Sequence, residues 1–192
     1  MIEIKENFLN DTDYQELFKT INDMNFPWYW HEIATYSKGN VDALSEKFNS
    51  IEGFMDYPQM AHVLYDNKKP NSLYYDIVDE LLLSKFLIEG DSLLRIKLNL
   101  NFPISNITFG KPHIDTIDPI ANKTSIYYLN DSDGDTIFFN ESPDDFTELT
   151  IKQKFTPKAN TLITFDTNTI HCGCPPVNTL KRIVMNIVHG RS

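Results

Sequence analysis

Apolar residues in the first part of the chain recur with helical spacing in two segments. Between 11 and 24 they fall every three or four positions, at Tyr14, Leu17, Phe18, Ile21 and Met24. This spacing predicts an amphipathic helix with one buried stripe, whose first turn Asp11 or Thr12 can cap. Residues 72–89 repeat the pattern and predict a second helix, which starts at Ser72 and stops before Gly90. The aromatic segment 26–30 predicts a strand followed by loops.

Beyond residue 90 the pattern changes to the two-residue period of β-strands. Apolar residues occupy every second position from Leu94 to Leu100, which makes one face of this strand apolar. Further strands are predicted at 124–130, 136–139, 149–155, 160–166 and 182–188. Asp133-Gly134 lies between two of them and predicts a hairpin turn. Many short strands predict a mainly β fold, a sandwich or a barrel-like roll, with the two α-helices packed outside.

Length and composition are those of one globular domain. The chain has 192 residues, of which 41% are hydrophobic, and this is enough to bury a substantial core. We find no repeat or linker and predict a single domain over 1–192, with a helical and mixed layer over about 1–90 and a β-roll core over about 91–189. The sequence contains no apolar run of 18 residues and no secretory signal pattern. Its two cysteines give no disulfide framework, so we expect a cytoplasmic protein.

The formal net charge of −10 argues against a protein that binds nucleic acid. Such proteins need clustered Lys and Arg side chains to displace counterions from the phosphate backbone. This chain has 17 Lys and Arg residues against 27 Asp and Glu residues. We therefore expect neither a nucleic acid nor a membrane among its partners, and the sequence leaves the oligomeric state open.

The segment KPHID at 111–115 carries the first chemical signal. His113 and Asp115 are two residues apart, so on an extended backbone their side chains point the same way. An imidazole and a carboxylate that meet a second imidazole form the facial triad of non-haem Fe(II) sites, in which the other metal positions stay open. The pair alone occurs often by chance. His171, which follows the predicted strand 160–166 and a polar turn, is the candidate for the third ligand.

Arg182 opens the last predicted strand, soon after His171. A guanidinium group is a rigid planar fork that suits bidentate pairing with a carboxylate. Since a lone buried charge is costly, an Arg at the start of an apolar strand needs a partner. That partner is either the distal carboxylate of a metal-bound 2-oxoglutarate or one of the 27 acidic residues in a structural salt bridge.

The order of these motifs resembles the 2-oxoglutarate/Fe(II) oxygenases of the prolyl-hydroxylase-like branch. The chain runs from H-x-D through SIYYLN at 125–130 and GDT-x-FF at 134–139 to His171 and Arg182. The segments FPWYW at 26–30, QMAHVLY at 59–65 and RIKLNLN at 95–101 further resemble small members encoded by tailed bacteriophages. The resemblance is dense over 95–188. It implies a double-stranded β-helix, or jelly-roll, whose open mouth holds iron.

By this resemblance, His113, Asp115 and His171 are the iron ligands and Arg182 holds 2-oxoglutarate. The resemblance also implies that Tyr128 donates its hydroxyl to the same distal carboxylate. The implied reaction is oxidative decarboxylation of 2-oxoglutarate by O2 to succinate and CO2, coupled to oxidation of a second substrate. Ascorbate is the expected supporting reductant.

The sequence departs from the family pattern at two places. Many relatives carry Arg-x-Ser or Arg-x-Thr, whereas this chain has Arg182-Ile183-Val184. This places more weight on Tyr128, with Thr161 or Thr164 as alternatives for the second hydroxyl. The nucleic-acid demethylase branch has a second Arg six residues after the clamp, where this chain has Val188. Together with the acidic charge, this argues against DNA or RNA repair.

Several other residues are candidates for the site or for the core. Asn99 and Asn101 lie on the polar face of the strand after residue 90, and inside a β-roll that face can meet the cosubstrate. The remaining histidines lack a carboxylate or cysteine at a ligand-like spacing, so we expect structural or surface roles for His31, His62 and His189. Trp28 and Trp30 favour packing in the N-terminal layer over a substrate wall, and Cys172 and Cys174 favour reduced thiols behind the metal.

Two classes of function remain open at this point. The first is an oxygenase, most simply a hydroxylase, which acts on a peptidyl residue or on a small molecule. The second is a non-catalytic double-stranded β-helix protein that binds a metal or ligand in a structural or accessory role. The presence of all three candidate ligands together with Arg182 favours the enzyme.

Overall fold

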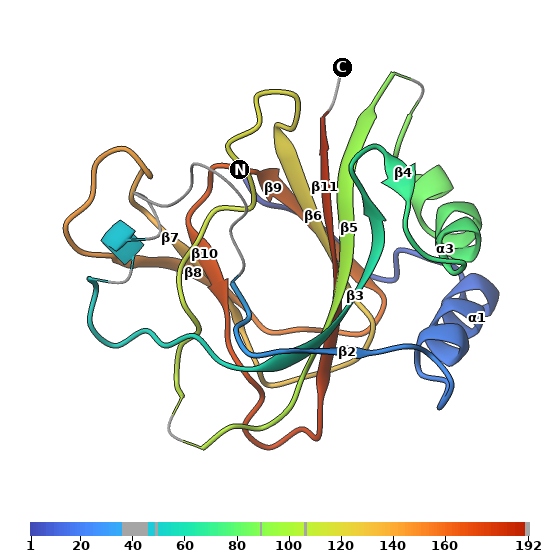
Figure 1. The fold of residues 1–192 in the computed structure, drawn as a ribbon, viewed down its shortest axis with the longest axis horizontal. Helices are drawn as coiled ribbons and strands as arrows, with labels where there is room; N and C mark the ends of the chain where they lie inside the picture. Colours follow the sequence, from blue (N-terminus) through green and yellow to red (C-terminus); the bar gives the residue numbers. More distant parts are fainter. Residues whose placement is uncertain (36–45, 49, 89, 106, 191–192) are drawn as a thin grey trace.

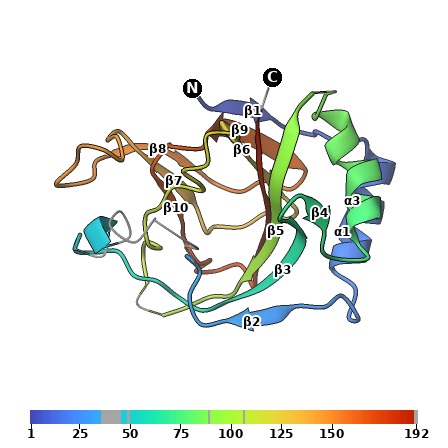
Figure 2. The same cartoon turned by 45° about the horizontal axis from the view of Figure 1, so that its top comes forward.

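The protein is a roll of two antiparallel sheets that face each other, with helices on the outside of the larger sheet (Figure 1, Figure 2). The computed structural model describes residues 1–35, 46–48, 50–88, 90–105 and 107–190. The strands are β1 (Glu3–Lys5), β2 (Tyr29–His31), β3 (Gln59–Asp66), β4 (Lys69–Pro70), β5 (Ser92–Asn101), β6 (Lys123–Tyr128), β7 (Thr136–Phe139), β8 (Ile151–Phe155), β9 (Thr161–Asp166), β10 (His171–Gly173) and β11 (Arg182–Gly190). The helices are α1 (Asp11–Ile21), α3 (Tyr75–Leu81) and the 3-10 helix η1 (Leu83–Lys85).

The strand order confirms a mainly β jelly-roll with flanking helices. The larger sheet has the order β1-β9-β6-β11-β5-β3-β2, with β4 paired to β3, and the smaller sheet has the order β10-β7-β8. Every one of these pairs is antiparallel. No helix within the described ranges is long and apolar enough to cross a membrane.

The two faces of β5 separate an apolar layer from a polar interior. Ile96, Leu98 and Leu100 are buried in the largest core cluster, which also contains the apolar residues of α1 and α3. Burying a side chain of this size contributes about 1.5–3 kcal/mol, so this layer holds the helices on the sheet. The residues between them, including Asn99 and Asn101, point to the opposite face, toward the smaller sheet. In Figure 1, α1 and α3 lie to the right of β5 and the smaller sheet lies to its left.

The first helix begins one residue earlier than the sequence suggested. Asn10, and not Asp11 or Thr12, is its cap, because the Asn10 side chain accepts a hydrogen bond from the Asp13 N–H at 2.9 Å. The helix also ends before Met24, whose side chain is 93% exposed and does not belong to the buried stripe.

The second predicted helix, 72–89, is interrupted in the structure. The α-helix covers only Tyr75–Leu81, and the tighter η1 follows it. Leu81, Leu82 and Leu83 are all buried. Three consecutive residues cannot share one stripe of a regular α-helix, and the 3-10 turn brings the last of them to the core. Gly90 has a φ of 98°, a conformation that favours glycine, while the last predicted helical position, 89, lies outside the described residues.

The hairpin predicted at Asp133-Gly134 is wrong. β6 pairs with β9 and β11, whereas β7 pairs with β8 and β10, so this connection crosses from one sheet to the other. The Asp133 carboxylate accepts hydrogen bonds from the backbone N–H groups of Val177, Asn178 and Thr179 at 2.7–3.2 Å. These bonds tie the crossover to the turn before β11. A two-residue turn signal predicts a local bend but does not determine which strands pair.

The aromatic segment 26–30 is only partly a core element. Trp28 packs against the largest core cluster, as predicted. The prediction of core packing is wrong for Trp30, which lies on the edge strand β2 and is 63% exposed. The strand itself covers Tyr29–His31.

Asn160 anchors the N-terminal segment to the roll. Its φ of 56° lies in the left-handed region, which Asn tolerates better than most residues. Its side-chain oxygen accepts hydrogen bonds from the Leu9 N–H at 2.9 Å and from the Tyr127 hydroxyl at 2.8 Å. Its side-chain nitrogen donates to the Leu9 carbonyl at 2.8 Å. The amide therefore satisfies three buried polar groups at once.

We expect Asn160→Ala to lower the free energy of unfolding by about 2–4 kcal/mol, because it leaves these groups without partners and places alanine at a positive φ. Chemical denaturation measures the change. The exposed Asn168 is a matched control, and Asn168→Ala should change the stability by less than about 0.5 kcal/mol. Equal stability of the two variants would contradict the anchoring role.

Candidate active site

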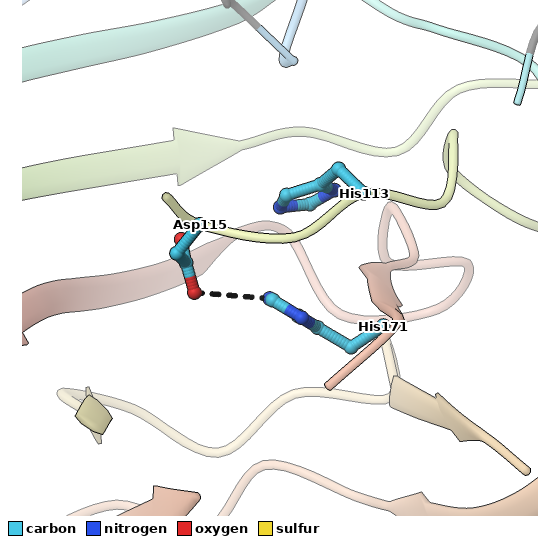
Figure 3. A group of neighbouring side chains, drawn as sticks. All are labelled: His113, Asp115 and His171. Carbon is cyan, nitrogen blue, oxygen red and sulfur yellow. Dashed lines mark ion pairs between the residues drawn. The ribbon is translucent and has the colours of Figure 1, made fainter. Parts of the chain in front are cut away.

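His113, Asp115 and His171 come together between the two sheets (Figure 3). His171 is the first residue of β10, and an isolated antiparallel bridge joins it to His113. The His113 N–H donates to the His171 carbonyl at 2.9 Å, and the His171 N–H donates to the His113 carbonyl at 3.0 Å. One ligand-type atom from each of the three residues lies within 4.8 Å of the others. The H-x-D pair and the distant histidine thus meet at one point.

Each imidazole is oriented by a nearby backbone carbonyl. Nδ1 of His113 lies 3.1 Å from the carbonyl oxygen of Lys111, and Nδ1 of His171 lies 3.0 Å from that of Thr169. Because a carbonyl oxygen only accepts, each Nδ1 carries a proton, and in the neutral imidazole the lone pair is then on Nε2. This second hydrogen bond is how proteins fix the tautomer of a metal-binding histidine.

The Asp115 carboxylate is held through one oxygen and left free at the other. Oδ1 accepts hydrogen bonds from Nη2 of Arg95 at 3.2 Å and from Nδ2 of Asn186 at 2.9 Å. Oδ2 is buried without a hydrogen-bond partner and lies 3.5 Å from Nε2 of His171. A buried carboxylate oxygen without a partner is costly, and a cation at this point would satisfy it. Two neutral imidazoles and a carboxylate are the donor set of non-haem Fe(II) sites, so the residues present fit that metal.

The surroundings also favour the protonation states that bind a metal. Burial, together with the neighbouring His171, lowers the pKa of His113 to about 4. Burial alone would raise the pKa of Asp115, but His171 and Arg95 outweigh it and hold this pKa below its usual range. Near neutral pH, His113 is therefore neutral and Asp115 is ionised, as a metal requires of its ligands.

Aromatic rings lock the position of His171. Phe165 packs edge-on against its imidazole with ring centroids 4.9 Å apart, and Phe138 stacks on it at 6.1 Å. Cys172 and Cys174 belong to a separate apolar cluster on the smaller sheet and are free thiols. Their reduced state behind the metal stays a prediction.

Arg182 lies across a small cavity from the two histidines. The cavity encloses about 80 Å³, and its wall includes His113, His171, Asn99, Asn101, Thr136 and Arg182. Arg182 as a residue is 4% exposed. It donates to the Gly134 carbonyl at 2.8 Å, to the Thr136 hydroxyl at 2.9 Å and to the Asn101 side-chain oxygen at 3.3 Å.

No acidic residue in the described part of the chain forms an ion pair with Arg182. The structural salt bridge that the sequence left open is therefore not seen. A buried cation beside a cavity, with neutral acceptors only, is suited to an anionic ligand.

Two glycines allow the backbone to approach this guanidinium closely. A Cβ atom at Gly134 would lie 2.6 Å from the Cys174 carbonyl oxygen and 3.0 Å from Cδ of Arg182. A Cβ atom at Gly173 would lie 3.4 Å from Nη1 of Arg182. A larger residue at Gly134 would displace either the backbone or the Arg182 side chain.

The other residues that the sequence assigned to the site, Asn99, Asn101 and Tyr128, lie near Arg182. Asn101 lies between Arg182 and Gln59, to which it donates at 3.1 Å, and Asn99 lines the cavity with a buried side-chain oxygen that has no hydrogen-bond partner. Tyr128 is fully buried. Its ring centroid is 5.9 Å from Cζ of Arg182, and its hydroxyl lies 2.7 Å from that of Thr136.

Sequence reasoning missed Arg95, Asn186 and Thr136. Arg95 had a readable signal, because it shares the polar face of β5 with Asn99 and Asn101. Asn186 and Thr136 had none, since only the pairing of distant strands brings them to Asp115 and Arg182.

Two of the remaining histidines have structural roles, as expected. His62 lies between the Pro27 carbonyl at 2.6 Å and the Ser72 hydroxyl at 2.7 Å. His189 lies 3.0 Å from the Ser125 hydroxyl. Both are buried.

Residues 104–188 match the 2OG-Fe(II) oxygenase superfamily. This segment contains the triad, Thr136 and Arg182, so the match covers most of the site just described. None of the curated proteins compared with the chain matches it.

Solved structures of oxygenases share the fold at low sequence identity. A prolyl-4-hydroxylase from Pseudomonas putida is 14% identical, with a TM-score of 0.52 over 100% of this chain and 93% of that one. A prolyl hydroxylase from Trichoplax adhaerens, in complex with a peptide fragment of hypoxia inducible factor, is 16% identical, with a TM-score of 0.57 over 98% and 83%. The epimerase SnoN from nogalamycin biosynthesis, in complex with Fe3+, alpha ketoglutarate and nogalamycin RO, is 12% identical, with a TM-score of 0.59 over 98% and 78%.

The superfamily match falls on the segment that carries the candidate ligands. The structural neighbours add that the whole chain, helices included, follows the oxygenase architecture. The match over the segment that holds the triad and Arg182 supports an enzyme of the 2-oxoglutarate-dependent dioxygenase class, with Fe(II) and 2-oxoglutarate as its cofactors; the solved structures show that the fold is shared.

Proposed function

We propose that this protein is a hydroxylase in which His113, Asp115 and His171 hold Fe(II) and Arg182 holds the distal carboxylate of 2-oxoglutarate. The proposal rests on two buried charged groups at one cavity that have no partner of opposite charge to satisfy them fully. The triad has a buried carboxylate oxygen without a partner, and Arg182 has no acidic partner among the described residues. A metal ion and a dicarboxylate would satisfy both.

When bound, Fe(II) supplies the oxidative decarboxylation of 2-oxoglutarate by O2 to succinate and CO2 and the oxidation of the second substrate. The contribution of the protein is orientation. Arg95 and Asn186 hold Oδ1 of Asp115 so that Oδ2 faces the histidines. The Lys111 and Thr169 carbonyls keep the protons on Nδ1 of both histidines. Phe138 and Phe165 exclude water from the side of the imidazole of His171 that they cover.

We assign Tyr128, Asn99 and Asn101 to the binding of the cosubstrate. The Tyr128 hydroxyl and Nη2 of Arg182 both contact Oγ1 of Thr136, so the two groups converge on one place. A bound carboxylate could take both donors in place of the threonine oxygen. Asn101 orients the guanidinium, and the unpaired oxygen of Asn99 is available to a donor in the cavity.

We propose a peptidyl residue or a small molecule as the substrate that is hydroxylated. A prolyl hydroxylase that binds a peptide and an enzyme that acts in nogalamycin biosynthesis both share this fold, and the fold does not determine the substrate. We also propose a cytoplasmic location, supported by the two free thiols. An origin in a tailed bacteriophage rests on the sequence resemblance of the three segments named above.

Removal of one triad imidazole tests the metal site. Purified wild-type protein with Fe(II), ascorbate and air should convert 2-oxoglutarate to succinate without an added substrate. We expect His171→Ala to lower this rate by more than about 100-fold, because the loss of a ligand should exceed the effect of losing an outer partner. The control is His31→Ala, on the edge strand β2, which should retain the activity.

Fe(II)-dependent succinate formation by His171→Ala would show that the metal site is assigned wrongly. If wild-type protein neither forms succinate nor binds Fe(II) and 2-oxoglutarate, the oxygenase assignment is wrong and a non-catalytic role is favoured.

Removal of the guanidinium tests the cosubstrate clamp. We expect Arg182→Met to weaken 2-oxoglutarate binding by about 10- to 100-fold, since a charge-assisted hydrogen bond contributes about 1.5–3 kcal/mol. Arg182→Lys should be intermediate, because lysine keeps the charge but loses the fork. Calorimetric titration of the metal-loaded protein measures the Kd, with Lys152→Met on the exposed strand β8 as control. An unchanged Kd in Arg182→Met would disprove the clamp.

Loss of the Tyr128 hydroxyl tests the second anchor. We expect Tyr128→Phe to raise the Kd of 2-oxoglutarate by about 5- to 10-fold, the effect of one hydrogen bond of about 1–1.5 kcal/mol. If the Kd stays constant while the stability falls, the hydroxyl serves only to hold Thr136.

A further inference from the structure

Lys97 is a further cation beside this site, in addition to Arg182, Arg95 and Lys111, and no described group pairs with it. It lies on β5 opposite Asn186 of β11 and Val63 of β3. Directly opposed residues of an antiparallel pair share one face, so Lys97 shares the inner face with Asn186, whose amide donates to Asp115. The lysine therefore lies on the wall next to the metal ligands. It has neither a hydrogen bond nor an ion pair within the described ranges.

The neighbouring carboxylates do not account for Lys97. Arg95 and Asn186 already hold one oxygen of Asp115, and the other faces the two histidines. Asp56, the other nearby acid, accepts hydrogen bonds from the backbone N–H groups of Ala34, Thr35 and Tyr57 and from the Thr35 hydroxyl. Both carboxylates thus have other partners, and Lys97 is not needed to neutralise them.

The position of this amine is unfavourable for its charge. Burial, with the like charge of Arg95, lowers the pKa of Lys97 to about 8, against the opposing effect of Asp115 and Asp56. A cation held at such a cost has a structural or functional reason to be there. A bound anion would offset the cost.

The loaded site has an excess of positive charge even without Lys97. Fe(II) carries two positive charges and 2-oxoglutarate two negative ones, so their charges cancel. Among the side chains, Arg182 and Lys111 line the cavity and Arg95 pairs with Asp115, so the cations outnumber the single carboxylate of Asp115. Lys97 adds to this excess in a chain whose net charge is −10. The field at the site therefore favours an anion over a neutral or cationic group.

We propose that the substrate oxidised by this enzyme carries a carboxylate and that Lys97 binds it. The inference rests on the proposed function, because it assumes that Arg182 is occupied by 2-oxoglutarate. The class of substrate is a carboxylic acid, either free or as an acidic side chain of a peptide. Lys97 determines specificity by pairing with that group at the wall next to the metal ligands.

The test uses acetate as the probe and acetamide as its neutral counterpart. The protein is loaded with Zn(II) as a diamagnetic substitute for Fe(II) and with saturating 2-oxoglutarate, which occupies Arg182. The NMR signal of the Lys97 ε-methylene group, assigned from its loss in Lys97→Arg, is followed during each titration. We expect a saturable shift with acetate and none with acetamide. The exposed Lys69 on β4 should show only a small linear drift.

Two variants separate the charge from the fold. Acetate binding, measured from the broadening of the acetate signal, should persist in Lys97→Arg and weaken at least tenfold in Lys97→Met. Any of three results would overturn the proposal. The Lys97 signal drifts only as the Lys69 signal does, it responds equally to acetamide, or Lys97→Met binds acetate as wild type does.

Failure of this inference differs from failure of the proposed function. Binding of 2-oxoglutarate is measured first on the same sample. Without it, both proposals fall. With 2-oxoglutarate bound and no acetate response, only the role of Lys97 is rejected. If acetate does bind, propionate and the peptide-like N-acetyl-glutamate methylamide distinguish the two sources of the carboxylate. The compound that resembles the true source should bind wild type more tightly than the other. In Lys97→Met the two compounds should bind with equal affinity.

Discussion

The buried carboxylate of Asp115 is the group on which the rest of the site depends. One oxygen is held by Arg95 of β5 and Asn186 of β11, and the other is left for a metal. These two contacts require β5 and β11 to pair in one register, and that register also sets Arg182 opposite Asn101. A slip by one residue would turn every polar residue of the inner face toward the helices. The register of two central strands therefore positions both the metal ligand and the cosubstrate clamp.

The apolar layers around this polar interior offset the unfavourable free energy of burying its charges. The outer face of β5 is buried against α1 and α3, and a second cluster, with Tyr128, Phe138 and Phe165, fills the space between the sheets. Hydrophobic burial on these layers stabilises a roll whose inner wall holds Arg182 without a counter-charge. Ligands that bring the missing charges should stabilise the folded state further, because they bind the native protein and not the unfolded chain.

The sequence predicted the parts of this structure that depend on local patterns. The alternation at 94–100 predicted β5, and the H-x-D spacing predicted that His113 and Asp115 would act together. It did not predict the crossover at Asp133-Gly134 or the roles of Arg95, Asn186 and Thr136, because these depend on which distant strands pair. The strand β3 was also missed, since QMAHVLYD is nearly all buried or half-buried and shows no clean two-residue period. Resemblance of motif order supplied the jelly-roll, which periodicity alone left as a sandwich or a barrel.

The most direct measurement is the binding of 2-oxoglutarate to the protein under anaerobic conditions, with and without one equivalent of Fe(II). If one cavity holds both cofactors, about one molecule of 2-oxoglutarate should bind per chain, and Fe(II) should tighten its binding at least tenfold, since one end of the ligand chelates the metal while Arg182 takes the other. Binding that is indifferent to Fe(II), or that survives unchanged after removal of the Asp115 carboxylate in Asp115→Ala, would contradict the account.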